Sequence, residues 1–389
     1  MANTLTNLIP DIYAALDVVS RELVGFIPAV ARDSSADRVA ANQTLRVPVS
    51  PVNAAGGNIT PAMSLPSAAD QTIANVTLTI SKQRFFPFSW TGEEQKSVNA
   101  GPGFLTLQQG QIAQAIRAAI NEMELDIATA AYQGASRAYG TVNTIPFNTT
   151  VGDYSEAAQT RKILDDNGAP LSDRHLVINT TAGAALRGKQ AQMQMVGTPD
   201  LLRNGILFDI NGFSIRESAQ VVTATAGTLS GGNTTGALTV GQTVLPLKNA
   251  TGTGAAVAGD IITLANDSNK YVVASVSQAG ANPATGDTIT LAAPGIRLAQ
   301  ASADRAITMI ATGPRNVGFT RNSILLATRL PIVPAEGDLA SDRMTITDPV
   351  SGISLEFAVY PGFRMNVYHV SLCWGVSVIK PEHVAILLG

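Results

Sequence analysis

The chain has 389 residues, of which 45% are hydrophobic and 14% charged, and its formal net charge is −3 at pH 7. This composition can bury large cores, and the lack of a basic excess argues against a dedicated nucleic-acid binder. The charged fraction is well below the roughly 25% of ordinary soluble proteins, which suits a chain that is buried inside a large assembly. The lone Cys373 excludes an intrachain disulfide. We expect neither a secretory signal nor a membrane span.

Residues 4–31 are predicted to form an amphipathic helix. Apolar residues keep helical spacing along it, at Leu8, Ile12, Leu16, Val19, Leu23 and Phe26. Such a face needs a partner surface, which is either the chain's own domain or a neighbouring subunit.

Residues 44–96 are predicted to be extended. Residues 44–49 and 73–81 alternate between apolar and polar side chains, and a segment rich in Pro, Ala, Gly and Ser, residues 51–70, lies between them. This pattern predicts a long two-stranded hairpin with a loose tip. Such a hairpin is marginally stable alone, so we expect it to lie on another surface.

Four aromatic residues gather at the base of this hairpin: Phe85, Phe86, Phe88 and Trp90. They either form a local core that joins the hairpin to the helix that follows, or anchor a neighbouring subunit, since aromatic side chains concentrate at interface hot spots.

The stretch 106–132 is predicted to be a long helix around which the chain is organised. Its apolar stripe is formed by Ile112, Ile116, Ile120, Met123, Ile127 and Ala131. Arg117, Asn121, Glu122 and Glu124 are expected mostly on the other faces. Glu122 and Asp126, one turn apart, are interpreted as a solvated or salt-bridged pair rather than as catalytic carboxylates.

Mixed α/β patterning follows. Helices are expected from residue 153 to 167 and from 182 to 195, with a strand at 175–179 between them and a tight turn at Asn211-Gly212. Residues 224–312 then become rich in Gly, Thr and Ala, and short β-runs separated by turns predict an inserted barrel or sandwich. Strands resume from 316 to 331 and run through 365–379 and 384–388.

A search for catalytic chemistry finds no credible active site. Residues 183–190 approach a phosphate-binding loop, with Lys189 in the lysine position, but Gln190 replaces the Ser or Thr that would reach magnesium. The histidines, His175, His369 and His383, have no metal-ligand spacing. We therefore expect no enzyme activity, no metal and no cofactor.

The order of these elements resembles the major coat proteins of tailed bacteriophages, which share the Hong Kong phage capsid fold. The resemblance covers essentially the whole chain and is closest to the subgroup from short-tailed temperate phages, whose axial domain carries an inserted β-barrel. It is carried by residues 212–217 before the insert, by 316–319 and 329–331 after it, and by 372–376 and 380–382 near the C-terminus.

The resemblance implies an α+β fold. Its parts would be an N-terminal arm (1–43), an extended loop (44–96), a peripheral domain with the spine helix (97–151), an axial domain (152–223), the inserted β-barrel (224–312), and returning axial and peripheral strands (313–389).

The implied function is a major capsid protein that self-assembles, as pentamers and hexamers, into an icosahedral virion shell. Implied partners are a scaffolding protein, a portal protein and non-specifically contacted double-stranded DNA, with procapsid assembly in the host cytoplasm, maturation by expansion and no membrane. The alternatives are a cellular nanocompartment shell of the same fold and a nucleotide-dependent enzyme using Lys189.

Two departures from the family pattern limit what carries over. Lys82 and Lys96 lie near the base of the extended loop, so no cross-linking through its tip is predicted. The insert carries few charged residues, and the loop 279–285 is the only part of it that we expect to contact a neighbouring capsomer.

Overall fold

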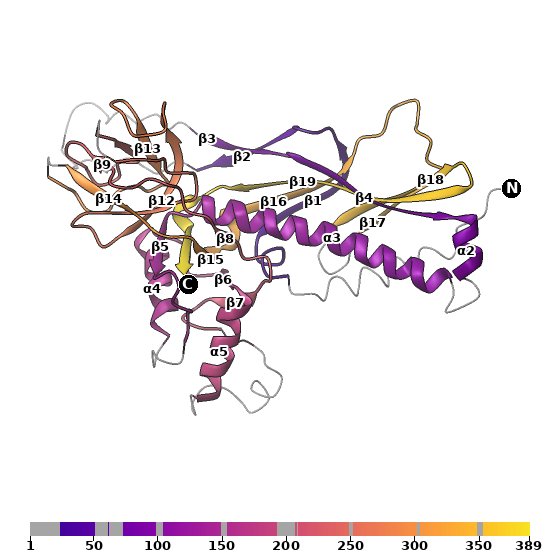
Figure 1. Ribbon diagram of the computed structural model, residues 1–389, viewed down its shortest axis with the longest axis horizontal. Coiled ribbons are helices and arrows are strands. Elements are labelled where there is room, and N and C mark those ends of the chain that lie inside the picture. The colour runs from indigo at the N-terminus through magenta and orange to yellow at the C-terminus, as the bar shows by residue number, and fades with distance from the viewer. Residues whose placement is uncertain are drawn as a thin grey trace.

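The computed structural model describes residues 24–50, 61, 73–98, 104–148, 154–192, 207, 209–248, 252–301, 304–347 and 353–389. The fold is mixed α/β, with few helices and two large sheets. One long helix lies parallel to the long axis of the molecule, and long strands run beside it, whereas the short strands lie beyond one end of the helix (Figure 1).

That long helix is α3, Phe104–Gln133, which at about 1.5 Å per residue extends roughly 45 Å. All six residues of the predicted apolar stripe are buried, with exposed fractions of 7% or less. The stripe packs into the largest hydrophobic cluster, together with side chains from both sheets. Periodicity therefore predicts the helix and the apolar part of its buried face.

The first sheet has the order β1-β16-β19-β18-β17, and β4 pairs with β19 outside that path. Its central strand β19 is long enough to pair with β18 and then β16 along its length, and with β4 over ten positions. The strand bounds are β1 Ala31–Val39, β4 Lys82–Thr91, β16 Ile324–Pro331, β17 Asp342–Thr347, β18 Ser354–Gly362 and β19 Met365–Val378.

The predicted hairpin is present as β2 (Thr44–Val49) and β3 (Ala74–Thr79), which form a two-stranded sheet of their own. Its base is held by a small cluster in which Leu78 and Ile80 pack with Val39, Ala327 and Cys373. The expected tip, residues 51–70, lies outside the described residues except for Pro61.

The second sheet begins with β7-β6-β15-β20-β5, and its strands pair in both parallel and antiparallel fashion. A separate cluster joins these strands to helices α4 (Ser155–Asp166) and α5 (Thr180–Gln192). The Asn211-Gly212 turn is confirmed, because both residues have positive φ and Ile210 bridges Phe213. The strand bounds are β5 Arg137–Gly140, β6 Arg174–Ile178, β7 Ser214–Glu217, β15 Gly313–Thr320 and β20 Val384–Leu388.

The segment from 223 to 309 is built from short strands, as its composition predicts. They surround a third hydrophobic cluster that takes all its residues from 229–309. Strand β12 also pairs with β5, so the second sheet continues into this segment without a break. The strands are β8 Thr223–Ala224, β9 Asn233–Thr234, β10 Val244–Pro246, β11 Ile261–Leu264, β12 Lys270–Ser277, β13 Thr288–Leu291 and β14 Arg305–Met309.

Two short 3₁₀ helices turn the chain at the junctions between strands. The first, η1 (Arg321–Ser323), links β15 to β16, and the second, η2 (Pro381–His383), links β19 to β20. The second lies between the two C-terminal strands that the sequence predicts, 365–379 and 384–388. At each of these two turns the chain therefore passes from one sheet to the other.

Two predicted boundaries are wrong. The N-terminal helix was expected to reach residue 31, but residues 24–30 form no helix and Ala31 begins β1. Residues 1–23 lie outside the described residues. The extended stretch was expected to reach residue 96, but α2 (Gly92–Val98) begins at Gly92. There Thr91 Oγ1 accepts a hydrogen bond from the Glu94 N–H, and the Glu94 carboxylate accepts one from the Thr91 N–H, which is a capping box.

A third expectation fails on α3 itself. Glu124 was placed on an outer face, but its exposed fraction is 1%. Position 124 is three residues before Ile127, so it lies at the edge of the apolar stripe. Its carboxylate is covered by backbone from elsewhere in the chain.

Candidate assembly surfaces

The four aromatic residues at the hairpin base divide between the two faces of β4. Trp90 is buried, and its Nε1–H donates to Gln111 Oε1 of α3 at 2.6 Å. Phe88 stacks on Tyr368, with ring centroids 5.0 Å apart, and Phe86 is half-buried. These three side chains share one face, because side chains alternate along a strand. For Trp90 and Phe88 the structure places the aromatic ring in the local core next to α3.

Phe85 points to the opposite face and is 60% exposed. Its ring lies 5.0 Å from that of His369, which in turn lies 4.8 Å from the ring of Tyr360. These three rings line a groove of about 390 Å³, whose floor also carries Glu356 and Arg343. Among the four aromatic candidates, Phe85 offers the most accessible surface for a neighbouring chain.

The Glu122–Asp126 pair is salt-bridged, as the sequence predicts. Lys82 Nζ lies 3.1 Å from Glu122 Oε1 and 2.8 Å from Asp126 Oδ1, and Arg84 Nε lies 2.9 Å from Glu122 Oε1. Burial lowers the pKa of Lys82, but its hydrogen bonds and charge interactions with both carboxylates outweigh this and raise it. Strand β4 is therefore held to α3 by charge as well as by Trp90.

The segment around Lys189 is a helix and not a phosphate-binding loop. Residues 183–190 all belong to α5, so most of their N–H groups are used inside the helix. Lys189 is 2% exposed, and its Nζ lies 5.1 Å from the Tyr154 ring centroid. A Cβ on Gly183 would lie 2.6 Å from the Glu217 carboxylate, so close packing explains the glycine.

The described residues contain no group of three or more His, Cys, Asp or Glu that could hold a metal. His369 faces the groove, His383 lies in η2 and His175 lies in β6, so the three are on different elements. Within the same described ranges, no helix is long and apolar enough to cross a membrane.

His175 is the most strongly perturbed of the histidines. It is 4% exposed and its Nδ1 makes no hydrogen bond. Burial lowers the pKa of His175 to about 4, helped by the nearby positive charges of Arg216 and Arg321 and opposed by Asp173.

We expect His175 to make the subunit less stable in mild acid. Because the folded pKa of about 4 lies below the ordinary 6.5, the unfolded chain takes up the proton first as the pH falls. The stability associated with the uncharged, buried His175 is fully present above pH 6.5 and is lost as the pH falls toward 4. At about 1.4 kcal/mol per pH unit, the loss between pH 8 and pH 5 is about 2 kcal/mol. Urea unfolding of the wild-type chain and of His175→Gln measures this, and equal pH slopes would refute it.

No protein-family model matches the chain, and no curated protein matches it. Solved structures do. The capsid of the cyanophage P-SCSP1u is 10% identical, with a TM-score of 0.49, over 92% of this chain and 86% of that one. The structure of Mycobacterium phage Che8 is 13% identical, with a TM-score of 0.45, over 90% and 85%. The virus-like particle from Pyrococcus furiosus is 8% identical, with a TM-score of 0.41, over 98% and 100%.

This chain is similar to phage capsid structures along at least nine-tenths of its length.

Proposed function

We propose that the chain is the major capsid protein of a tailed, double-stranded-DNA bacteriophage and self-assembles into an icosahedral shell. The observation that carries the proposal is the β2–β3 hairpin, which forms a two-stranded sheet by itself while its base is fixed in the core.

The hairpin is an incomplete structure in an isolated subunit. Two strands without a third strand or a covering helix are marginally stable in water. Side chains along β2 alternate between exposed and half-exposed, and Ile73, next to β3, is 69% exposed. A surface on another subunit would complete the hairpin, and one arm per subunit gives a repeating head-to-tail contact that can close into rings.

The order of the elements supports the Hong Kong phage capsid fold. The hairpin is followed by the long helix α3, then by the α/β unit of α4, β6 and α5, and the last strands return to both sheets. On this proposal α3 is the spine helix, and the first sheet, with β4, forms the peripheral domain. The unit at 152–223 with β15 and β20 forms the axial domain.

The segment 224–312 is proposed as an inserted β-barrel domain. Its own hydrophobic cluster supports this division, although its sheet is continuous with β5. The partners that belong to this function are a scaffolding protein, a portal protein and packaged DNA, with assembly in the host cytoplasm and residence in the virion. Contacts through Phe85 at the groove, and through the loop 279–285, are proposed as additional subunit contacts.

The proposal predicts that the exposed hairpin residue Ile73 drives assembly. Ile73→Ser should leave the stability of the free subunit within about 0.5 kcal/mol, because the side chain is exposed. It should nevertheless shift the purified chain from large particles to small oligomers, as measured by sedimentation velocity at equal protein concentration.

Leu171→Ser is the matched control, because Leu171 is 71% exposed and lies away from the hairpin. It should sediment like the wild type. A wild-type chain that remains monomeric with or without its scaffolding protein would refute the proposed function.

A further inference from the structure

Glu124, in the middle of the long helix, is a buried carboxylate that binds backbone. Its Oε1 accepts hydrogen bonds from the N–H groups of Gly25 at 2.6 Å and Phe26 at 2.7 Å, and from the Ser218 hydroxyl at 2.9 Å. Its Oε2 accepts one from the Ile27 N–H at 2.9 Å. None of the ion pairs among the described residues includes this carboxylate. Its charge is therefore held by dipoles and not by a partner cation.

Successive backbone N–H groups that converge on one point form a concave anion site. In many proteins such a site binds a phosphate or another external anion, but here the chain supplies its own anion. Burial raises the pKa of Glu124, and the four donated hydrogen bonds oppose that rise. Removing the carboxylate would leave three buried N–H groups without an acceptor, which is costly.

Glu124 and the groups that donate to it, which we call the clamp, join three parts of the chain that are far apart in sequence. Residues 24–30 are the first described residues and precede β1. Ser218 directly follows β7 and begins the run toward residues 224–312. Its N–H donates to the Ile178 carbonyl of β6. The N-terminal segment, the long helix and the approach to the small β-strands therefore meet at a single carboxylate.

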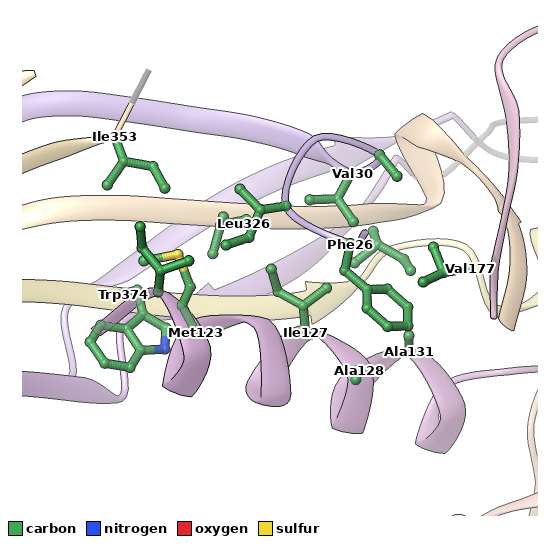
Figure 2. Close-up of a cluster of buried hydrophobic side chains, with 14 of the residues drawn as sticks. Phe26, Val30, Met123, Ile127, Ala128, Ala131, Val177, Leu326, Ile353 and Trp374 are labelled. Carbon is green, nitrogen blue, oxygen red and sulfur yellow. The ribbon is translucent and has the colours of Figure 1, made fainter. Parts of the chain in front are cut away.

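The surroundings show that this junction is closely fitted. A Cβ on Gly25 would lie 2.9 Å from Val177 Cγ1 and 3.0 Å from the Glu217 carbonyl oxygen, so a side chain at position 25 would disturb its neighbours. Phe26 is fully buried and stacks on Phe319, with ring centroids 6.2 Å apart. Figure 2 shows Phe26 reaching down to α3 beside Ala131, with Val177 close by.

Apolar burial and the carboxylate do different things here. Phe26 and Ile27 would favour any docking that covers them, because the hydrophobic effect is not directional. The carboxylate accepts only a backbone that presents three successive N–H groups at one point, so it selects a single register. It thereby specifies the position and direction of the chain at residue 24.

We propose that Glu124 is the positioning residue that fixes the register in which residues 24–30 dock on α3, and that correct closure of the shell depends on this register. This inference rests on the proposed function. The Ser218 hydroxyl also donates to Glu124, so the same carboxylate ties residues 25–27 to the segment that leads into the small β-strands.

The test compares Glu124→Gln, Ser218→Ala and the control Gln114→Ala, which removes an exposed polar side chain from the same helix. Gln keeps the size of the side chain but presents an amide N–H₂ to backbone N–H groups that require an acceptor. Hydrogen exchange at the amides of residues 25–27 should become at least about tenfold faster in Glu124→Gln and about threefold faster in Ser218→Ala. It should not change in Gln114→Ala, and exchange in β20 should stay slow in all three.

Assembly is then compared by electron microscopy of the same four proteins. Wild type and Gln114→Ala should form the same closed shells, whereas Glu124→Gln should form open sheets or shells of a different size. Unchanged exchange at residues 25–27, or shells of Glu124→Gln identical to the wild type, would overturn the inference. If exchange in β20 also becomes faster in Glu124→Gln, that variant has lost overall stability, and the milder Ser218→Ala variant tests the inference instead. Absence of shells from the wild type would overturn the proposed function instead.

Discussion

Replacing Trp374 by alanine should destabilise the subunit by about 3–5 kcal/mol, a large part of the total stability of a domain. Trp374 is 1% exposed and is the largest of the fully buried side chains. Its Nε1–H donates to Asp126 Oδ2 of α3 at 2.8 Å, so the substitution empties core volume and removes a bond between β19 and the helix. Urea unfolding of the unassembled chain, followed by circular dichroism, measures the loss.

Trp374→Phe separates the two contributions. It keeps most of the buried apolar volume but loses the donor to Asp126, which retains its ion pair with Lys82. We expect a loss of about 1–2 kcal/mol, mainly from the hydrogen bond to a charged group. If the alanine variant were no less stable than the phenylalanine variant, the packing of β19 on α3 would be wrong.

Gly375→Ala should loosen the base of the hairpin and reduce assembly. A Cβ at position 375 would lie 2.2 Å from the Thr79 carbonyl oxygen, 2.9 Å from the Thr79 carbonyl carbon and 3.0 Å from Ile80 Cα. All three are backbone atoms, so no side chain can rotate away and the end of β3 must move. Overpacking of this kind costs about 1–3 kcal/mol. Hydrogen exchange at residues 78–80, together with particle yield, measures the effect.

Gly188→Ala is the matched control, because a Cβ there meets nothing within 4 Å and the residue lies inside α5. Alanine is favoured over glycine in a helix, so this variant should gain about 0.5–1 kcal/mol. The placement of the hairpin base would be refuted if both variants assembled with equal yield and equal exchange at residues 78–80.

Patterns that depend on residues close together in the sequence predicted most of the elements. The stripe from Ile112 to Ala131 predicted the apolar face of α3, and the alternating residues at 44–49 and 73–81 predicted β2 and β3 to within two residues. Each of these elements is decided by local periodicity, which the sequence displays directly.

The errors came from two sources. Helix α2 was missed although its capping box, Thr91 to Glu94, is readable in the sequence as Thr-Gly-Glu-Glu. The N-terminal helix was extended too far because helical spacing at Phe26 does not reveal that the N–H groups of residues 25–27 bind Glu124.

The candidate contact surface was only partly predictable. The cluster of aromatic residues identified β4 as a candidate contact strand. Which face of β4 is buried depends on its register with β19, in which Phe85 pairs with Ser371 and Phe88 with Tyr368. That pairing joins residues nearly 300 positions apart, so no local pattern contains it. Burial of Trp90 and exposure of Phe85 follow from this register together with the packing of α3 on one face of the sheet.

Closure of this subunit into shells is the central proposal. The most direct measurement is cryo-electron microscopy of the purified wild-type chain, expressed alone and with the scaffolding protein that the proposed function requires. We predict closed particles of uniform size with icosahedral symmetry, in which the β2–β3 hairpin of each subunit lies across a neighbour. A preparation that stays monomeric under both conditions, or particles in which the hairpin folds back on its own subunit, would contradict the account.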